Sequence, residues 1–363
     1  MSSYFKILEN IDWGLIALVL ALIAAGLLTL YSATHVGQTG LFFKQIAWIG
    51  IGCAALLMGF AVDYRFLMRL AWPLYGLVVA LLLAVLIFGR EISGARRWLS
   101  LGPMSIQPSE LAKIMVIIFI GYWGSKKKDL EDYGFRELLL PTAILCVPVG
   151  LILAQPDLGT AGMVLLIASG MFLMIGIRRS TLITSFLMFL AFLPIGWFSL
   201  KEYQRLRILS FIDPTRDPLG SGYHALQSKI AVGSGGFLGK GFLHGTQTQL
   251  RFLPEHHTDF IFSVVAEEWG FLGSFVVIAL FFLLIAKIVA VGLKAKDRFG
   301  ALVCFGIAIF IGLHAFINTA MTMGLFPVVG VPLPFISYGG TFMAINLACI
   351  GVVLCVAWRK YMF

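Results

Sequence analysis

Long apolar runs recur along the whole chain, and they constrain its fold more than any other feature of the sequence. An apolar helix needs about 20 residues to cross the ~30 Å hydrocarbon core of a bilayer. The ~10-residue alternating segments of a membrane β-barrel do not occur. The sequence therefore predicts an all-α polytopic membrane protein, a single integral membrane domain over residues 1–363. Its about ten transmembrane helices are expected at approximately residues 12–32, 45–62, 67–88, 107–124, 138–154, 159–176, 181–200, 259–286, 300–323 and 340–358.

The sparse charges orient this bundle. Only 12% of the residues are charged, and the net charge of +9 comes from basic residues scattered through short loops, which disfavours nucleic acid as a partner. The termini and the loops on their side hold fourteen Lys and Arg residues, whereas the opposite short loops hold four. Basic short loops face the cytoplasm. We therefore expect cytoplasmic termini and a large extracytoplasmic loop, 201–258, between helices 7 and 8.

The polar clusters of chemical interest all fall on the predicted outer side. They are GARRWLSLGPMSIQPSELAK, QPDLG, PEHHTD and PLPFISYGG, and they come from four separate loops. The convergence of four loops on one face indicates an extracytoplasmic site rather than a cytoplasmic one.

The first cluster contains an acid and base pair and an arginine. Glu110 and Lys113 lie one turn apart at the start of a predicted span, where they form either a helix-start ion pair or a functional pair that faces a cavity. Function is favoured, because ionisable groups within a membrane span usually mark a working site. Arg97 either binds a phosphate through charge-assisted hydrogen bonds or extends to lipid headgroups, and both interpretations stay open.

Two aspartates lie at helix starts. Capping alone explains Asp157, but Thr258 is an equally good cap beside Asp259, which leaves Asp259 free for another role. Burial raises the pKa of a carboxylate toward the range useful for a general base. Glu267 and Glu268 are expected two to three turns deeper than Asp259, about 12–14 Å at a rise of ~1.5 Å per residue, where at least one is buried or paired. Structural pairing is the default interpretation of both.

Two possible ligand sites in the long loop are weak. His256, His257 and Asp259 do not have a strong zinc spacing, so no metal ligands are predicted, although a loosely held divalent ion stays open. The segment 233–241, GSGGFLGKG, fails the spacing of a phosphate-binding loop and predicts no ATP site.

The segment PLPFISYGG interrupts the chain before the last span with prolines and glycines. Irregular backbone at membrane depth survives only where it is buried in protein or lines a cavity. Ser337 and Tyr338 are the polar groups that this segment would present there.

In chain order, GARRW, QPSExxK, QPDLG, LPEHHTDFIFSVVAEEWG and PFISYGG resemble the SEDS family (shape, elongation, division and sporulation) over nearly the whole chain. The segment before HTDFIF is most similar to the elongation branch of that family. The resemblance implies a peptidoglycan glycosyltransferase that polymerises lipid II at the outer face of the bacterial inner membrane. A class B penicillin-binding protein is the partner that it implies.

The resemblance also implies roles for individual residues. The family's essential aspartate falls on Asp259, and its other motif residues fall on Arg97, Glu110, Lys113 and Asp157. Lys44 stands where relatives often carry arginine, so a phosphate contact there would be a point charge rather than a fork. We expect Lys44 and Ser337 to complete the substrate-binding set.

The resemblance further implies inverting glycosyl transfer, to which the outward carboxylate and the nearby cations are suited. Asp259 takes the proton from the acceptor sugar's 4-hydroxyl, while Arg97, Lys113 or a divalent cation such as Mg²⁺ or Mn²⁺ offsets the charge of the leaving pyrophosphate. The alternative function is a lipid II flippase. A transporter should carry charged groups near mid-membrane on several spans, and here most of them cluster at one face. A scaffold that only recruits a partner would leave these charges unexplained.

Overall fold

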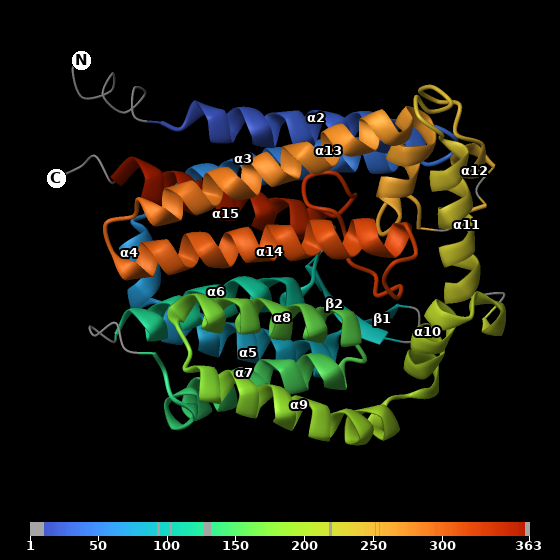
Figure 1. Cartoon of the computed structure of the whole chain (residues 1–363). Coiled ribbons are helices and arrows are strands. Elements are labelled where there is room, and N and C mark those ends of the chain that lie inside the picture. Colours follow the sequence, from blue (N-terminus) through green and yellow to red (C-terminus); the bar gives the residue numbers. More distant parts are fainter. Residues whose placement is uncertain are drawn as a thin grey trace, which may run out of the picture.

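Ten long helices run side by side within the described part of the chain (Figure 1). The computed structural model describes residues 11–92, 95–101, 104–126, 132–217, 220–250, 252–253 and 255–359. The upper group in Figure 1 contains α2 (Trp13–Thr34), α3 (Thr39–Ala61), α13 (Ile261–Leu293), α14 (Arg298–Thr322) and α15 (Gly340–Arg359). The lower group contains α5 (Ala71–Phe88), α6 (Pro108–Ser125), α7 (Phe135–Ala154), α8 (Leu158–Ile175) and α9 (Arg179–Ser199). The short α4 (Tyr64–Arg69) lies between α3 and α5 in the chain.

The helices confirm the predicted polytopic membrane protein. Within the described residues, nine helices are long and apolar enough to cross a membrane. The tenth long helix is α6, which has the same length as α5 and α8 but carries Glu110 and Lys113 in its first turns. The prediction of about ten spans therefore holds if α6 is counted, and α6 differs from the rest because it brings ionisable groups into the bundle.

Two central helices join the groups. In the upper group α3 packs on α15, and α13 packs on both α2 and α14. Within the lower group α6 packs on α5 and α8, and across the groups α14 contacts both α6 and α8. These contacts bury a continuous apolar core that includes Val116, Ile167 and Phe310. Most side chains of α9, by contrast, are exposed within the chain, as expected for a helix that faces lipid.

The loop elements gather at one end of the bundle, on the right in Figure 1. They are α10 (Glu202–Ile212), η1 (Pro214–Arg216), α11 (Ser221–Ser234) and α12 (Thr246–Gln249). The start of α2 and the end of α15 lie at the opposite end. The predicted separation of the long loop from both termini is therefore seen, although Lys6, Lys127, Lys128 and Lys360, which contributed to the predicted orientation, lie outside the described residues.

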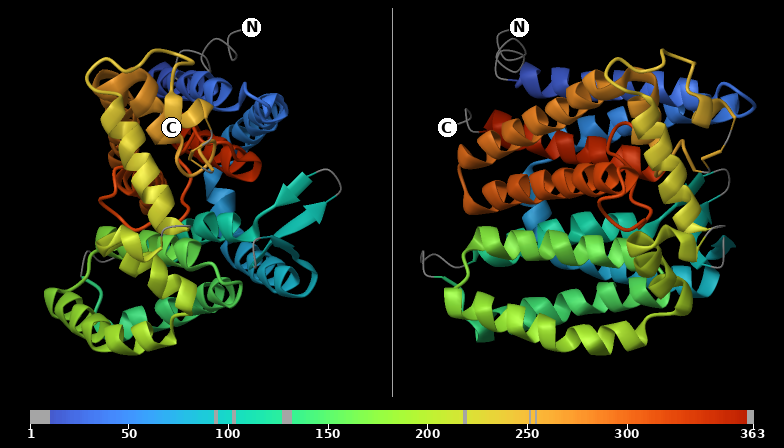
Figure 2. Two further views of the ribbon diagram at one scale, coloured as in Figure 1. Left: turned by 90° about the vertical axis from the view of Figure 1, so that its right-hand side faces the viewer. Right: turned by 45° about the vertical axis from the view of Figure 1, so that its right-hand side comes forward.

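A small antiparallel sheet at the loop end was not predicted from the sequence. Its order is β1-β2-β3, with β1 (Arg90–Ile92), β2 (Ala95–Leu101) and β3 (Met104–Ile106). Figure 2 shows the hairpin beside the helices. The strands are three to seven residues long, too short for a clear alternating pattern in the sequence.

The helix α13 is not the straight span that the sequence predicted. Gly270 has φ 64° and ψ −156°, a conformation that glycine tolerates, and the helix changes direction there. The nine residues before the bend stay near the loop end, where the backbone N–H groups of Lys240 and Gly241 donate to the backbone carbonyls of Glu267 and Glu268 at 3.0 Å each. Both glutamates therefore lie beside the loop rather than toward the middle of the bundle, which the sequence did not anticipate. The expectation that at least one of them is buried or paired is confirmed, since both are buried and Glu267 pairs with Lys240 at 2.7 Å.

Candidate active site

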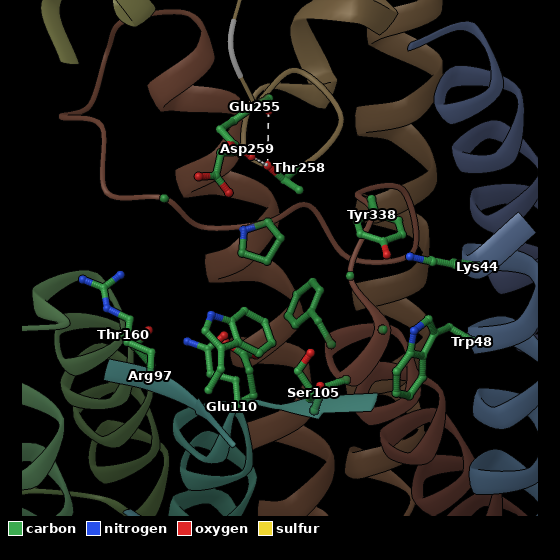
Figure 3. A pocket seen from close by; sticks show the side chains of 18 of the residues that line it. Lys44, Trp48, Arg97, Ser105, Glu110, Thr160, Glu255, Thr258, Asp259 and Tyr338 are labelled. Atoms are coloured by element: carbon green, nitrogen blue, oxygen red, sulfur yellow. Dashed lines mark hydrogen bonds between the residues drawn. The ribbon is translucent and has the colours of Figure 1, made fainter. Parts of the chain in front are cut away.

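A cavity of about 660 Å³ opens at the loop end, between the two helix groups. Its walls come from α3, the β2 and β3 strands, the starts of α6 and α8, the turn before α13, and the segment before α15. Figure 3 shows ionisable side chains from several of these elements around one space. Five of the predicted site residues line it, namely Lys44, Arg97, Glu110, Asp157 and Asp259.

The turn that carries Asp259 is held by backbone contacts. Asn318 of α14 donates from Nδ2 to the Asp259 carbonyl at 2.8 Å. The Ser337 hydroxyl donates to the Thr258 carbonyl at 2.6 Å, and the Tyr338 N–H donates to the His257 carbonyl at 2.9 Å. The backbone of Asp259 is thus fixed, while its carboxylate points into the cavity (Figure 3).

Gly330 allows the segment before α15 to pass close to this carboxylate. Its φ is +73°, and a Cβ atom built on it would lie 3.2 Å from Oδ2 of Asp259. A side chain at position 330 would therefore strain the backbone and displace the carboxylate.

The electrostatic surroundings suit Asp259 to proton transfer. Burial raises the pKa of Asp259 to about 7, and the negative charge of Glu255 adds to the increase. Arg207 and Arg97 oppose it, but burial dominates. A carboxylate whose pKa is near neutrality is partly deprotonated at physiological pH and accepts a proton readily, which a general base requires.

Arg97 and Asp157 form the facing wall. Arg97 donates from Nη2 to the Pro156 carbonyl at 2.5 Å, and its Nη1 lies 3.8 Å from Oδ1 of Asp157. Asp157 also caps α8, since it accepts from the backbone N–H of Thr160 at 3.2 Å and from its hydroxyl at 2.9 Å. The capping interpretation of Asp157 is thus correct, and the same carboxylate also orients Arg97 toward the cavity.

Glu110 and Lys113 extend the polar wall into the bundle. The Lys113 ammonium donates to Oε1 of Glu110 at 2.8 Å, and both side chains are almost fully buried. Glu110 still lines the cavity, and its buried Oε2 has no hydrogen-bond partner among the described residues. Lys113 does not line the cavity, so it acts on the cavity through Glu110.

Lys44 and Ser337 occupy different environments. Lys44 is exposed on α3 and lines the cavity on the side opposite Arg97, near Tyr338 (Figure 3). Ser337 is buried and does not line the cavity. Its hydroxyl accepts from the Leu333 N–H at 2.8 Å and donates to Thr258, so the structure places it in the wall, where it fixes the turn of Asp259.

The two loop histidines do not form a metal cluster with Asp259. Both ring nitrogens of the buried His256 lie against carbonyls, of Leu253 at 2.7 Å and of Ala33 at 2.9 Å. No cluster of three or more potential metal ligands was found in the described residues.

Three polar residues that contact the site were missed from the sequence. Gln45 accepts from the Gly339 N–H at 3.2 Å and donates to the Ser337 carbonyl at 3.3 Å, which links α3 to the PFISYGG segment. His314 and Asn318 lie within α14 and are fully buried. A polar side chain inside an apolar span was a usable signal for each of them.

Together the fold and the cavity define a polytopic membrane protein with an enzyme-like polar site at one end of its bundle. The chain matches the family described as "Cell cycle protein" (FtsW, RodA and SpoVE) over residues 12–362. It therefore belongs to this family, which is the SEDS family that its motifs resemble.

Individual relatives agree with this assignment. The chain is 38% identical to "Peptidoglycan glycosyltransferase MrdB" of Escherichia coli K12, covering 97% of this chain and 95% of that protein. It is 36% identical to "Probable peptidoglycan glycosyltransferase FtsW" of Trichlorobacter lovleyi, covering 96% and 93%.

Solved structures share the fold. A chain from the solved structure described as "Structural coordination of polymerization and crosslinking by a peptidoglycan synthase complex" superposes with a TM-score of 0.85 at 35% identity, covering 97% of this chain and 99% of that chain. The rod shape determining protein RodA of Thermus thermophilus gives a TM-score of 0.72 at 32% identity, covering 97% and 98%.

Proposed function

We propose that this chain is a peptidoglycan glycosyltransferase that polymerises lipid II into glycan strands during cell elongation. The observation that carries the proposal is the position of Asp259. Its carboxylate, with a pKa raised to about 7, faces a cavity that also presents the cations Arg97 and Lys44. The names of the similar proteins MrdB and FtsW support the same activity.

In the proposed reaction Asp259 is the general base. Its carboxylate accepts the proton of the acceptor sugar's 4-hydroxyl as that oxygen forms a bond to the anomeric carbon of the donor sugar. The bond between that carbon and the pyrophosphate oxygen breaks, and the polyprenyl pyrophosphate leaves with the electron pair. Attack from the side opposite the leaving group inverts the anomeric centre.

The cationic residues have a separate part in this proposal. Arg97 is oriented by Asp157 and offers a guanidinium to the leaving pyrophosphate. Lys44, on the other side of the cavity, offers a point charge to a second phosphate group. Two sites of this kind suit a reaction in which donor and acceptor both carry a lipid pyrophosphate. Lys113 completes the set by holding Glu110 at the cavity wall.

A divalent cation is a further part of the proposal. Mg²⁺ is commonly held by one or two carboxylates together with substrate phosphates and water. Glu255 lines the cavity, and its carboxylate fits that donor set when combined with the oxygens of a bound pyrophosphate. Mg²⁺ or Mn²⁺ held there would offset the negative charge of the pyrophosphate.

The proposed setting is the outer face of the bacterial inner membrane, with both termini in the cytoplasm. The long loop lies at the end of the bundle opposite the start of α2, and its residues Glu255 and Thr258 line the cavity, which supports this orientation. A class B penicillin-binding protein is the proposed partner. The similarity to a chain of a peptidoglycan synthase complex that coordinates polymerization and crosslinking supports this choice of partner.

The alternative function, a lipid II flippase, is less well supported. The sequence alone predicts Glu267 and Glu268 near mid-membrane, as a transport pathway would require. The bend at Gly270 keeps both glutamates beside the loop segment 239–248. The main observation in favour of a pathway is therefore removed.

The test is a polymerisation assay with purified protein and labelled lipid II. We expect Asp259→Asn to lower the rate of glycan formation by about 100-fold or more, because removal of a general base commonly costs 10²–10⁴. Asp213→Asn is the matched control, since Asp213 pairs with Arg216 in the exposed loop. Wild-type rates from Asp259→Asn would remove the general-base assignment. Lipid II that reaches the opposite leaflet of proteoliposomes without forming polymer would favour the flippase.

A further inference from the structure

Two polar side chains of α14 have no role in the proposed chemistry. His314 and Asn318 are fully buried and lie one helical turn apart on the same face. Burying a polar group inside a membrane bundle is costly unless it is hydrogen-bonded, so their partners indicate what they do.

Asn318 connects the turn of Asp259 to the segment before α15. Its Nδ2 donates to the carbonyl of Asp259 at 2.8 Å and to the carbonyl of Val331 at 2.7 Å. Both hydrogens of the amide are therefore used. Because Gly330 packs against the Asp259 carboxylate, Asn318 fixes the backbone on both sides of that contact.

His314 connects the same segment to Lys113. Its Nδ1 lies 3.2 Å from the Pro332 carbonyl, and its Nε2 lies 3.0 Å from Nζ of Lys113. A carbonyl only accepts and an ammonium only donates, so Nδ1 carries the hydrogen and Nε2 accepts. The imidazole is thus the neutral Nδ1–H tautomer.

The surroundings leave the His314 ring little freedom. Its centroid lies 4.8 Å from those of both Phe310 and Phe342. Lys113, held by His314 on one side, binds Glu110 on the other at 2.8 Å. The position of Glu110 at the cavity wall therefore depends on a chain of contacts that begins at α14.

We propose that His314 and Asn318 are positioning residues that hold two opposite walls of the active site in register. Asn318 sets the position of Asp259, and His314 sets the position of Lys113 and, through it, of Glu110. Both residues bind the segment 331–332 between these walls, so one helix face fixes the separation of the base from the Glu110–Lys113 pair. This inference rests on the proposed function, in which Asp259 is the base.

The first test compares two replacements of His314 in the lipid II polymerisation assay. Phenylalanine fills the space between Phe310 and Phe342 but makes neither hydrogen bond. Glutamine can donate to the Pro332 carbonyl and accept from Lys113. We expect His314→Phe to lower kcat per folded molecule by about tenfold or more with little change in KM, because small displacements of reacting groups slow the chemical step. We expect His314→Gln to stay within about threefold of wild type, because it keeps one donor and one acceptor.

Asn318→Ala gives the parallel test on the Asp259 side, with the same expected loss of kcat. Phe316→Leu is the control, since Phe316 lies on α14 but is 65% exposed. The folded fraction of each variant is measured by thermal unfolding in detergent. Wild-type kcat per folded molecule in His314→Phe and Asn318→Ala would overturn the proposal, and so would a loss in His314→Gln equal to that in His314→Phe.

Failure of this inference can be told apart from failure of the proposed function. If Asp259→Asn is inactive while His314→Phe and Asn318→Ala behave as wild type, only the positioning role is wrong. If Asp259→Asn is fully active, the general-base assignment falls, and this proposal falls with it.

A spectroscopic test reports on the tautomer directly. The chain contains six histidines, so the ¹⁵N signals of His314 are assigned as those lost from ¹⁵N-histidine-labelled protein in His314→Gln. We expect the shifts of a neutral ring protonated at Nδ1, and a change in the Nε2 shift in Lys113→Met. A ring protonated at Nε2, or at both nitrogens, would contradict the proposed contact with Lys113.

Discussion

The turn before α13 carries Asp259, and the first turns of α13 carry Glu267. These two carboxylates lie in contrasting environments. Asp259, in the turn, faces a cavity, and burial raises its pKa to about 7. Glu267, eight residues later, is fully buried and accepts from Lys240 at 2.7 Å, from the Thr246 hydroxyl at 3.1 Å and from the Gln247 N–H at 3.0 Å. Thr248 adds its hydroxyl at 3.2 Å.

The difference separates a reactive group from a structural one. The donors around Glu267 hold its carboxylate in place, as expected for a structural group. A carboxylate that is desolvated without such donors keeps a high affinity for protons. Position in the sequence does not distinguish the two, because both lie in one short polar-to-apolar junction. Their donors do.

The largest expected effect is on the pH dependence of activity, through the carboxyl group of Asp259. Only the carboxylate form accepts a proton, so a pKa of about 7 predicts that activity falls as the pH drops below 7. We expect kcat/KM at pH 5 to be roughly 100-fold below its plateau at pH 8, a tenfold loss per pH unit. The assay is run at a fixed concentration of divalent cation, with thermal unfolding at each pH as a control. A flat profile down to pH 5 would mean that the pKa lies near the ordinary value for aspartate.

The next largest effect is expected on the free energy of unfolding when Glu267 is replaced. Replacing Glu267 with glutamine removes the charge that balances Lys240 and turns an amide group toward several donors. We expect a loss of about 3 kcal/mol in the free energy of unfolding, in line with the removal of one partner from a buried ion pair. Glu202→Gln, in the exposed start of α10, is the control. Activity per folded molecule should stay within a few fold of wild type, and its complete loss without unfolding would place Glu267 in the reaction.

The smallest expected effect is also on stability, but here the substitution is expected to stabilise the protein rather than destabilise it. The folded state raises the pKa of Asp259, so its protonated form is favoured by folding, and this contribution is lost as the pH rises through about 7. Asparagine resembles the protonated form. Asp259→Asn should therefore be more stable than wild type at pH 8 by about 1–2 kcal/mol, and the advantage should shrink as the pH falls toward 4. Equal melting temperatures at pH 8 would show that the charged carboxylate is not destabilising.

Much of the fold and of the candidate site could be predicted from the sequence. Apolar runs set the spans, because crossing a bilayer imposes a length that few other structures require. Polar motifs at the ends of those spans predicted Arg97, Glu110, Asp157 and Asp259 as site residues, and the family resemblance added Lys44. All five line the cavity.

The remaining features depend on contacts between distant segments. A glycine inside an apolar run does not reveal a bend, so the contacts of Glu267 with the loop segment 240–248 were not anticipated, although its burial and pairing were. Ser337 was expected to face the substrate, but its partners, Leu333 and Thr258, come from a fold that its own motif does not specify. The structural roles of His314 and Asn318 depend on their hydrogen bonds to Lys113 and Asp259, which lie 201 and 59 residues away in the chain.

The level of the cavity along the bundle has a kinetic consequence. Residues at the starts of α3, α6 and α8 line it, so the lipid-anchored substrate of the proposed reaction would reach it without leaving the bilayer. Encounter then becomes a two-dimensional search, in which turnover follows the surface density of the lipid carrier rather than its bulk concentration. The growing strand, while its lipid anchor remains, stays within the same plane as the next monomer.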